Sequence, residues 1–424
     1  MGCPGDAFSG IPDEPDPLMT DRLDPLLRLH PFTRLNTLLQ GVEPGHQRPL
    51  LFSVGEPQAM PPGMIKGPLV QNLADWGRYP LATGTADFRA AAADWLVRRF
   101  HLPAAMIDPE RHLLPIAGTR QGLFFIALAA LQEPASPGER PAVLMPNPFY
   151  HVYAGAAAIA GGEPVFLPAT SENGFLPDPD LIDRRTLERT ALAYVCSPAN
   201  PQGAVASRPY LARWLALARR YGFMVAFDEC YSELYRDQPP AGALEAAADA
   251  GSSLENLVVF HSLSKRSSGA GLRSGFIAGE ERMMKRIAQL VNYGGVAIPY
   301  PILSASTALW RDEAHVAVNR ALYNENFALA RRILGNRMGP MPEGGFFLWL
   351  DVGNGEATAK RLWAEAGVKV LPGGYMARPD ANGQNPGERY IRVALVYDAA
   401  ATQDGLARMA RVLAAGHAAA TEEA

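Results

Sequence analysis

Hydrophobic residues along the middle of the chain are grouped into short runs that polar, helix-patterned stretches separate. Seven of these runs could be buried strands: His112–Ile116, Ala142–Met145, Glu163–Leu167, Ala191–Cys196, Met224–Asp228, Leu257–His261 and Phe276–Ala278. Clear helical stretches lie between several of them: Arg120–Gln132, Tyr150–Ala160 and Arg208–Tyr221. Buried strands separated by helices are typical of a mostly parallel sheet with helices on both faces. The pattern therefore predicts an α/β fold around a seven-stranded, mostly parallel sheet.

The last two predicted strands are connected differently from the others. A polar, glycine-rich loop at 262–275 joins them, and it has no helical pattern. Parallel neighbours need a crossover connection, which is usually a helix. This pair could therefore run antiparallel.

The pattern changes after residue 305. A long helix is expected at Ser306–Leu334, short strands at Phe346–Leu350 and Tyr390–Ala394, and a final helix at Gln403–Ala415. We expect this part to form a smaller α+β domain beside the larger one. The predicted bounds are a flexible tail at 1–19, a segment at 20–60 that joins the small domain, a large domain at 61–304, a small domain at 305–415 and a frayed end at 416–424.

Composition and charge exclude several classes of protein. With 48% hydrophobic and 19% charged residues, the chain can bury a large core, which argues against wholesale disorder. A net charge of −4 provides no basic field for DNA or RNA. The longest apolar run, 122–131, is about half of a membrane span. Three cysteines are too few and too scattered for a disulfide framework or a zinc site. Without the features of a signal peptide, a cytoplasmic enzyme or binding protein is expected.

Only five of the 39 basic residues are lysines, so chemistry that needs an amine has few candidates. Lys265 directly follows a buried strand, an unusual place for a residue type that is normally exposed. Burial lowers the pKa of a lysine and makes its amine available for a Schiff base. Ser262 and Arg273 lie in the same loop and could bind a phosphate.

Polar or aromatic residues also follow the other predicted strands, where ligands bind in α/β sheets. The turn before Thr119 could bind a phosphate at a helix N-terminus, although Thr is also a common N-cap. Tyr150 could stack on a planar ring or belong to the core, and Asn200 could bind a ligand oxygen or form an Asn-Pro turn. Asp228 ends a buried strand and needs a cationic or hydrogen-bonding partner, and Tyr231 follows it.

Together these residues supply what pyridoxal 5′-phosphate (PLP) needs. The PLP aldehyde would take Lys265, and its protonated pyridine nitrogen would face Asp228, so that the ring acts as an electron sink. Asn200 and Tyr231 would hold the ring oxygen while Tyr150 covers the ring.

Over roughly residues 20–415 the chain resembles the class I/II, fold-type I PLP-dependent aminotransferases. The matching motifs are Ser53-Val-Gly-Glu-Pro57, Tyr79-Pro-Leu-Ala-Thr-Gly84, Asn147-Pro-Phe-Tyr150, Asn200-Pro-Gln-Gly203, Asp228-Glu-Cys-Tyr231, Ser262-Leu-Ser-Lys265, Gly271-Leu-Arg273 and Tyr390-Ile-Arg-Val-Ala394. Two positions depart from the family's pattern. Gln202 stands where the family usually has Thr, and Ser268-Gly-Ala-Gly271 replaces a more rigid Asn-Val-Pro-Gly.

The resemblance implies further roles. Lys265 is the Schiff-base lysine and proton shuttle, and Arg392 binds the substrate α-carboxylate near the Gly55 backbone. Tyr79 reaches the cofactor phosphate of the neighbouring subunit, which implies a homodimer. The groups implied to bind the chain's own phosphate are the backbone of Thr119 and Arg120 and the side chains of Ser262 and Arg273.

Several longer strings are most similar to the proteobacterial N-succinyldiaminopimelate aminotransferases. They are His30-Pro-Phe-Thr-Arg-Leu35, Asn147-Pro-Phe-Tyr-His-Val-Tyr-Ala-Gly155, Glu172-Asn-Gly-Phe-Leu-Pro-Asp178, Phe260-His-Ser-Leu-Ser-Lys-Arg266, Asp312-Glu-Ala-His-Val316 and Asn385-Pro-Gly-Glu388. This similarity implies amino-group transfer between N-succinyl-LL-2,6-diaminopimelate and 2-oxoglutarate, a step of lysine biosynthesis.

Other functions remain open at this stage. The chain could be an aminotransferase for aspartate, alanine or an aromatic donor, or a PLP-dependent C–S lyase. A serine acyl-transferring enzyme is a rival, because Ser262-Leu-Ser-Lys265 matches S-x-x-K. Against it, the chain has no K-T-G motif, and we expect its lysine in a loop instead of a helix. A Rossmann oxidoreductase lacks its glycine fingerprint, and a PLP-binding regulator lacks a basic DNA-binding module.

Overall fold

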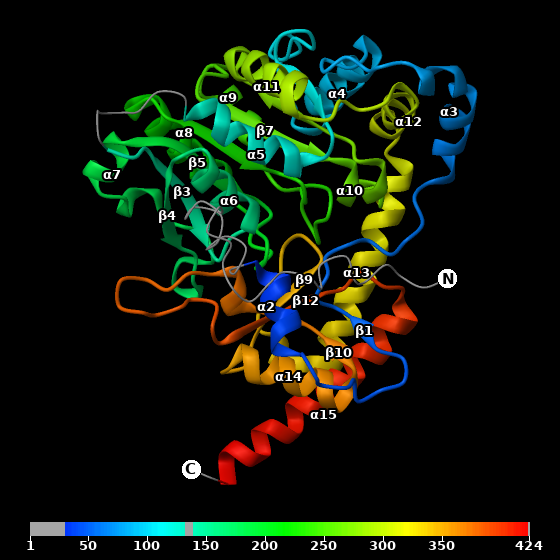
Figure 1. Cartoon of the computed structure of the whole chain (residues 1–424), viewed down its shortest axis with the longest axis vertical. Helices are drawn as coiled ribbons and strands as arrows, with labels where there is room; N and C mark the ends of the chain where they lie inside the picture. Colours follow the sequence, from blue (N-terminus) through cyan, green and yellow to red (C-terminus); the bar gives the residue numbers. More distant parts are fainter. Residues whose placement is uncertain (1–29, 132–138, 423–424) are drawn as a thin grey trace, which may run out of the picture.

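The computed structural model describes residues 30–131 and 139–422, which form a larger and a smaller part (Figure 1). The helices are α2 (Pro31–Leu38), α3 (Lys66–Gln71), α4 (Ala86–Arg99), α5 (Thr119–Ala130), α6 (His151–Ile159), α7 (Arg184–Glu188), α8 (Arg208–Tyr221), α9 (Ala243–Asp249), α10 (Leu263–Arg266), α11 (Glu281–Gly294), α12 (Tyr300–Arg311), α13 (Ala314–Leu334), α14 (Gly355–Ala366) and α15 (Ala399–Glu422). The strands are β1 (Leu50–Leu51), β2 (Leu113–Ile116), β3 (Ala142–Asn147), β4 (Glu163–Pro168), β5 (Thr190–Cys196), β6 (Met224–Asp228), β7 (Leu257–Ser262), β8 (Gly275–Gly279), β9 (Phe347–Asp351), β10 (Val368–Lys369), β11 (Leu371–Pro372) and β12 (Tyr390–Ala394).

The larger part contains the seven-stranded sheet that the sequence predicts. Its strand order is β2-β8-β7-β6-β5-β3-β4, and β8 runs antiparallel to both of its neighbours. The other neighbouring pairs are parallel. The predicted α/β fold and the antiparallel last pair are therefore confirmed, and the carboxyl ends of β3, β5, β6 and β7 meet at one edge.

Helices cover both faces of this sheet, as the buried apolar strands require. Residues of β6 alternate between two hydrophobic cores: Val225 and Phe227 pack on one face, and Met224 and Ala226 on the other. Helices α4, α8, α9 and α12 contribute to the first core, and α5, α6 and α11 to the second. Helices therefore hold the sheet on both faces, and a ligand site is expected at its carboxyl edge.

The smaller part is built on the three-stranded antiparallel sheet β11-β12-β9. Residues from α13, α14, α15 and both longer strands share its core, among them Phe327, Leu350, Leu362, Ile391 and Leu406. β1 from the N-terminal segment pairs in parallel with β10. Chain segments far apart in sequence thus form this part.

The single helix expected at Ser306–Leu334 is two helices, so that prediction is wrong. α12 begins at Tyr300, and the chain becomes extended at Asp312 before α13 begins. The carboxylate of Asp312 accepts a hydrogen bond of 2.9 Å from the backbone N–H of His315, as a capping residue does. The predicted domain boundary at 304/305 falls inside α12, and we propose that it lies nearer to this break.

Two ends of the chain also bear on the predictions. α15 continues to Glu422, past the expected helix end at Ala415, and the frayed end predicted at 416–424 stays a prediction. The Ala-rich composition of this segment favours helix. The predicted tail at 1–19 lies outside the described residues. In the part of the chain that the structure describes, no helix is long and apolar enough to cross a membrane.

The segment 262–275 is more ordered than the loop that the sequence predicts. Its first residues form α10, a single helical turn that Ser262 caps by accepting a hydrogen bond from the Ser264 N–H. A 3₁₀ turn follows at Ala270–Leu272. Lys265 therefore lies on a helix, and the expectation that it lies in a loop is corrected.

Candidate active site

A cavity of about 520 Å³ lies between the two parts, at the carboxyl edge of the large sheet. All predicted site residues except Tyr79 line it: Gly55, Thr119, Arg120, Tyr150, Asn200, Asp228, Tyr231, Ser262, Lys265, Arg273 and Arg392. Tyr79 is 98% exposed and does not line this cavity. Residues from both parts of the chain therefore build one site, as expected for a sheet edge at which ligands bind.

Lys265 points into the cavity from α10. Its amine donates a hydrogen bond to the carbonyl oxygen of Gly55, and it lies 5.1 Å from the ring centre of Phe346. Burial lowers the pKa of this amine to about 8. Ser262 bonds to Ser264 instead of the lysine amine. The Ser–Lys hydrogen bond that an acyl-transferring enzyme would use is therefore not found among the described residues.

The lowered pKa of Lys265 predicts how its reactivity depends on pH. Only the neutral amine is a nucleophile, so acetylation of Lys265 in the apoenzyme should fall about tenfold per pH unit below its pKa. We expect the rate to be half-maximal near pH 8, compared with the ordinary lysine value of 10.5. Timed acetic anhydride labelling and peptide mass spectrometry measure this rate, with the exposed Lys66 as an internal reference. A midpoint near 10.5 would contradict the burial of the amine.

Asp228 is a buried carboxylate that has no cationic partner among the described residues. Its Oδ2 accepts a hydrogen bond of 2.6 Å from the Tyr153 hydroxyl, and its Oδ1 accepts one of 3.3 Å from the Cys230 N–H. Burial raises the pKa of Asp228, and no ion pair to it is found within residues 30–131 and 139–422. A buried carboxylate in this state is stabilised by a cation, which the protonated nitrogen of a pyridine ring would supply.

Tyr153 is a site-supporting residue that the sequence analysis missed. It lies three residues after Tyr150, which directly precedes α6, and the two rings meet edge-to-face at 5.6 Å. Its ring stacks on that of Tyr194 at 4.4 Å and is fully buried. This spacing could have identified Tyr153 as a second tyrosine directed at the strand ends.

Arg392 is a buried cation without an acidic partner among the described residues. Its guanidinium donates to Asn200 Oδ1 at 3.1 Å and to the Ser53 carbonyl at 2.8 Å, and it lies over the ring of Phe347 at 4.3 Å. Its Nε has no hydrogen-bond partner, and burial lowers the pKa to about 10. An uncompensated buried arginine at a cavity wall is suited to a carboxylate ligand.

The third polar region of the cavity suits a phosphate. The N-terminus of the 12-residue helix α5 faces the cavity at Thr119 and Arg120. Gly118 precedes it with a φ of +81°, and a Cβ there would lie 2.2 Å from Nη2 of Arg273. Glycine therefore lets the guanidinium of Arg273 lie directly beside this helix end. Ser262 and Ser264 line the same region.

The remaining predicted groups lie around the space where a ring would bind. Tyr231 is buried with its ring edge-on to Phe346 and Phe347, at 5.4 and 5.8 Å. The Tyr150 hydroxyl accepts a hydrogen bond of 2.9 Å from Nε of Arg120. Gln202 is 6% exposed and does not line this cavity. The departure from the family's Thr at this position therefore leaves the cavity wall intact.

The cavity wall also contains residues that the sequence analysis did not assign. They are Pro31 and Phe32 of α2, and His151. The rings of His30 and His151 meet edge-to-face at 4.8 Å. Burial lowers the pKa of His151 to about 3, with a smaller contribution from His30. Within the described ranges, no group of three or more His, Cys, Asp or Glu residues could hold a metal ion.

Comparisons with known proteins agree with this site. The family model of class I and II aminotransferases matches residues 50–412, and the chain therefore belongs to this family. The LL-diaminopimelate aminotransferase of Syntrophobacter fumaroxidans is 32% identical over 374 residues, which cover 85% of this chain and 90% of that protein.

Solved structures give the same result. An aminotransferase from Neisseria meningitidis is 38% identical with a TM-score of 0.85, and the match covers 92% of this chain and 99% of that one. The aminotransferase AspB from Helicobacter pylori is 35% identical with a TM-score of 0.82, covering 90% of this chain and 97% of that one. The cofactor of the family is PLP, and the buried carboxylate, the buried amine and the helix N-terminus of this cavity fit that cofactor.

Proposed function

We propose that the protein transfers an amino group between N-succinyl-LL-2,6-diaminopimelate and 2-oxoglutarate. The observation that carries the proposal is the pair of uncompensated buried charges, Arg392 and Asp228, on the walls of a cavity that also holds the Lys265 amine. Arg392 suits an amino-acid carboxylate, Asp228 suits the pyridine nitrogen of PLP, and Lys265 suits proton transfer.

The proposed roles follow from where each group lies. PLP, when bound, supplies an aldehyde for the substrate amine and a ring that withdraws electrons from Cα. Arg392 orients the substrate through its carboxylate, with Asn200 Oδ1 fixing the guanidinium. The amine of Lys265 would accept the proton that leaves the substrate Cα, and in the reverse half-reaction it would return a proton to Cα. With a pKa of about 8, this amine can both accept and donate a proton near neutral pH.

Other predicted residues would hold the cofactor. The helix N-terminus at Thr119 and Arg120, with Ser262 and Arg273, would bind its phosphate. Tyr150 would cover the ring, while the Asn200 amide and the Tyr231 hydroxyl would reach the ring oxygen. The Gly55 carbonyl accepts a hydrogen bond from the Lys265 amine, so the segment after β1 would lie beside the substrate.

Two features of the cavity wall support the succinylated donor. The strings 30–35 and 147–155, which resemble the succinyldiaminopimelate enzymes, meet where His30 contacts His151, and residues of both strings line the cavity. Both strings therefore contribute to the cavity that would bind the substrate. The neutral His151 ring can hydrogen-bond to an amide or a carboxylate without adding charge.

Free and succinylated diaminopimelate differ in charge at the distal end. Succinylation replaces a distal ammonium with an amide and adds a carboxylate, so the binding of the two donors would depend differently on the charges of the cavity wall. The relatives named LL-diaminopimelate aminotransferase make the unmodified donor the main competitor.

A panel of amino donors with 2-oxoglutarate tests this proposal. We expect the highest kcat/KM for the succinylated donor, with weaker or no transfer from LL-diaminopimelate, aspartate, alanine and aromatic donors. Glutamate formation measures transfer, and pyruvate with ammonia but no acceptor would indicate a C–S lyase. Good activity on LL-diaminopimelate or aspartate and none on the succinylated donor would overturn the substrate but leave the aminotransferase.

Replacing His151 tests whether this part of the cavity wall binds the distal end of the donor. His151→Ala removes a partly buried ring that lines the cavity, and we expect the donor's KM to rise about tenfold, which corresponds to one lost hydrogen bond. The acceptor, 2-oxoglutarate, is shorter than the donor, and its KM should change little. Steady-state kinetics with both substrates measures the difference. Equal effects on both KM values would show that His151 does not act on the distal end.

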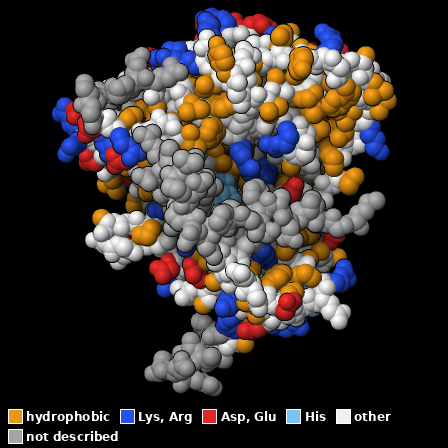
Figure 2. Space-filling model, viewed as in Figure 1, with side chains coloured by type: hydrophobic (Ala, Val, Ile, Leu, Met, Phe, Trp, Pro, Cys, Tyr) orange, Lys and Arg blue, Asp and Glu red, His pale blue; other side chains and the backbone are white. Residues whose placement is uncertain are grey.

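We also propose that the protein is a cytoplasmic homodimer. Large hydrophobic side chains are exposed together on and around α3: Met64, Val70, Leu73, Trp76, Tyr79 and Leu81. Figure 2 shows hydrophobic atoms gathered on the face over α3 and α12. Such a surface is typical of an interface. A second copy would cover it and would bring Tyr79 to the other subunit's site. Analytical ultracentrifugation should give a dimer, and a monomer that is fully active would contradict this proposal.

A further inference from the structure

The helical turn that carries Lys265 is attached to the first half of α13. Four residues make a helix that is not stable alone, so its last carbonyl groups need partners. The amide Nδ2 of Asn319 donates to the carbonyl oxygens of Lys265 and Arg266, at 2.8 and 3.1 Å. Its Oδ1 accepts from the Ser268 hydroxyl at 2.7 Å. One side chain of α13 thus caps the end of α10 and holds the residue that follows.

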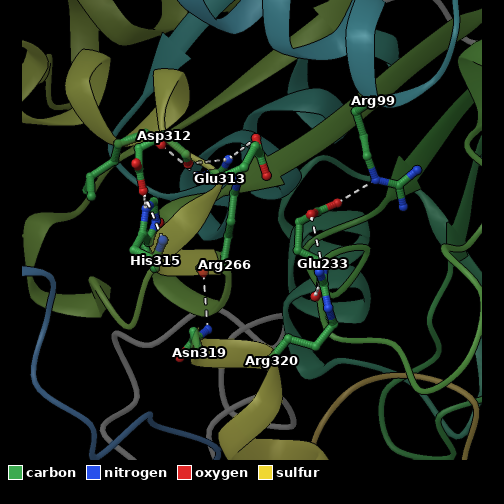
Figure 3. A network of polar contacts seen from close by, with 10 residues as sticks. Arg99, Glu233, Arg266, Asp312, Glu313, His315, Asn319 and Arg320 are labelled. Carbon is green, nitrogen blue, oxygen red and sulfur yellow. Dashed lines mark hydrogen bonds and ion pairs between the residues drawn. The ribbon is translucent and has the colours of Figure 1, made fainter. Parts of the chain in front are cut away.

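Neighbouring contacts attach the same segment (Figure 3). The Arg266 guanidinium is buried and donates to the Leu309 carbonyl at 2.8 Å and to Glu313 Oε1 at 2.6 Å. The Ser267 hydroxyl bonds to Nε2 of His315 at 2.8 Å, while Nδ1 of that ring bonds to Asp312 at 2.6 Å. This is a Ser–His–Asp arrangement, but Ser267 is fully buried and can attack no substrate. It therefore acts as a clamp on α10.

The next residue of α13 reaches the segment that carries Asp228 and Tyr231. Arg320 Nη1 donates to the Glu233 carbonyl at 3.2 Å, and Glu233 is also paired with Arg99 at 2.6 Å (Figure 3). Glu233 is buried between these two cations. The first turns of α13 therefore hold the lysine and the carboxylate segment together.

The second half of α13 is built into the smaller part. Its Phe327 and Leu334 belong to that core, and Figure 1 shows the helix running from beside α10 into the smaller part. Asn326 is fully buried and donates to the carbonyl oxygens of Leu395 and Tyr397, at 3.1 and 2.8 Å. These two residues directly follow β12, which carries Arg392.

Asn319 and Asn326 lie on the same face of one helix. Seven residues are almost two turns, so their side chains project from α13 in nearly the same direction, about 10 Å apart along the axis. Each uses its amide to hold two backbone carbonyls of a segment that carries a site residue. A regular helix between two such anchors resists a change in their spacing.

We propose that α13 is a strut that fixes the Lys265 segment relative to the Arg392 strand, with Asn319 and Asn326 as its positioning residues. Substrate bound at Arg392 then stabilises the lysine segment through this helix. The inference rests on the roles proposed above for Lys265 and Arg392.

Hydrogen exchange of the holoenzyme with glutarate tests the strut. Glutarate has the carboxylates that Arg392 would bind but no amine or oxo group, so no turnover occurs. In the unmodified protein, saturating glutarate should slow amide exchange of residues 263–269 at least about fivefold. Asn319→Ala should speed exchange of this segment about 5- to 30-fold without ligand, and the protection by glutarate should disappear. Its kcat should fall while the KM for the oxo acid is unchanged.

Further variants and a control distinguish a connection through α13 from an effect of local packing around α10. Asn319→Asp keeps the oxygen for Ser268 but cannot donate to the carbonyls, so it should behave like Asn319→Ala. Asn326→Ala should leave exchange of 263–269 unchanged without ligand and still abolish its protection by glutarate. Asn324→Ala is the matched control, because Asn324 lies on the same helix and bonds to Arg236 instead. It should retain the full effect of glutarate.

Two results would contradict the proposal that α13 connects the Lys265 segment to the Arg392 strand. Protection by glutarate that persists in Asn319→Ala and Asn326→Ala would show that α13 does not connect the two segments. Protection lost equally in Asn324→Ala would show only a general weakening of the helix. If glutarate does not bind the unmodified protein at all, the proposed role of Arg392 fails instead, so the two failures can be distinguished.

Discussion

Replacing Lys265 by alanine is expected to lower kcat at least about 10³-fold, the scale of a lost general base. Among the described residues that line the cavity, Lys265 is the one lysine, and its amine donates a hydrogen bond to the Gly55 carbonyl. The variant should also lose the long-wavelength absorbance of cofactor joined to lysine. Absorbance spectroscopy and donor-dependent glutamate formation measure the two effects.

A partly buried lysine outside the cavity provides the control for this experiment. Lys369 donates to Asn36 at 2.9 Å, and burial lowers the pKa of its amine too. Lys369→Ala should keep both the absorbance and the turnover, because Lys369 does not line the cavity. A Lys265→Ala enzyme with full activity would rule out the proposed mechanism.

The second large effect is expected for Asp228→Asn. Its carboxylate would form a buried pair with the cofactor's ring nitrogen, and removing one partner of such a pair costs about 3–5 kcal/mol. We expect kcat/KM to fall roughly 10²- to 10³-fold. The absorbance of bound cofactor should also shift, because the ring nitrogen is no longer held in its protonated form. Steady-state kinetics and spectra at a fixed PLP concentration measure both.

Tyr153→Phe is a milder change at the same carboxylate, and its effect can be compared with that of Asp228→Asn. It removes one hydrogen bond of 2.6 Å and leaves the carboxylate and the stacking on Tyr194 in place. We expect a loss of about tenfold, the scale of one charge-assisted hydrogen bond. Two variants with the same loss would indicate that the charge of Asp228 is unimportant, contrary to the proposed pairing.

The fold could be predicted from the sequence because its strands are both buried and short. The apolar run at Met224–Asp228 is a strand at those residues, and the helix at Arg208–Tyr221 has its predicted bounds. Burial on both faces makes such strands apolar throughout, and turns of Gly and Pro mark their ends. The lack of a helical crossover before β8 also indicates its direction.

The hydrophobic pattern predicts secondary structure less well where a single polar side chain determines the local backbone conformation. The break between α12 and α13 depends on the carboxylate of Asp312, which caps the second helix and holds His315. The turn of α10 depends on Asn319, which is far away in sequence. Neither contact leaves a periodic signal, so the pattern predicts one helix where there are two, and a loop where there is a helical turn.

The correction at α10 affects one argument about function. The sequence disfavours a serine acyl-transferring enzyme partly because it predicts Lys265 in a loop, and that reason does not hold. The geometry excludes this alternative on different grounds, since the Lys265 amine bonds to Gly55 and Ser262 bonds to Ser264. The family match agrees with this conclusion.

The sequence by itself determined the α/β sheet, the order of its strands along the chain and the amine on which the proposed chemistry depends. These features can be predicted because they depend on residues that are adjacent in the sequence, such as a lysine directly after a buried strand. Only the tertiary structure decided that Arg392 and Asp228 face one cavity with no oppositely charged partner among the described residues, and that side chains of α13 hydrogen-bond to the Lys265 segment and to the residues after β12. Burial and the absence of a partner are properties of the packed molecule, because they depend on every segment that surrounds a side chain.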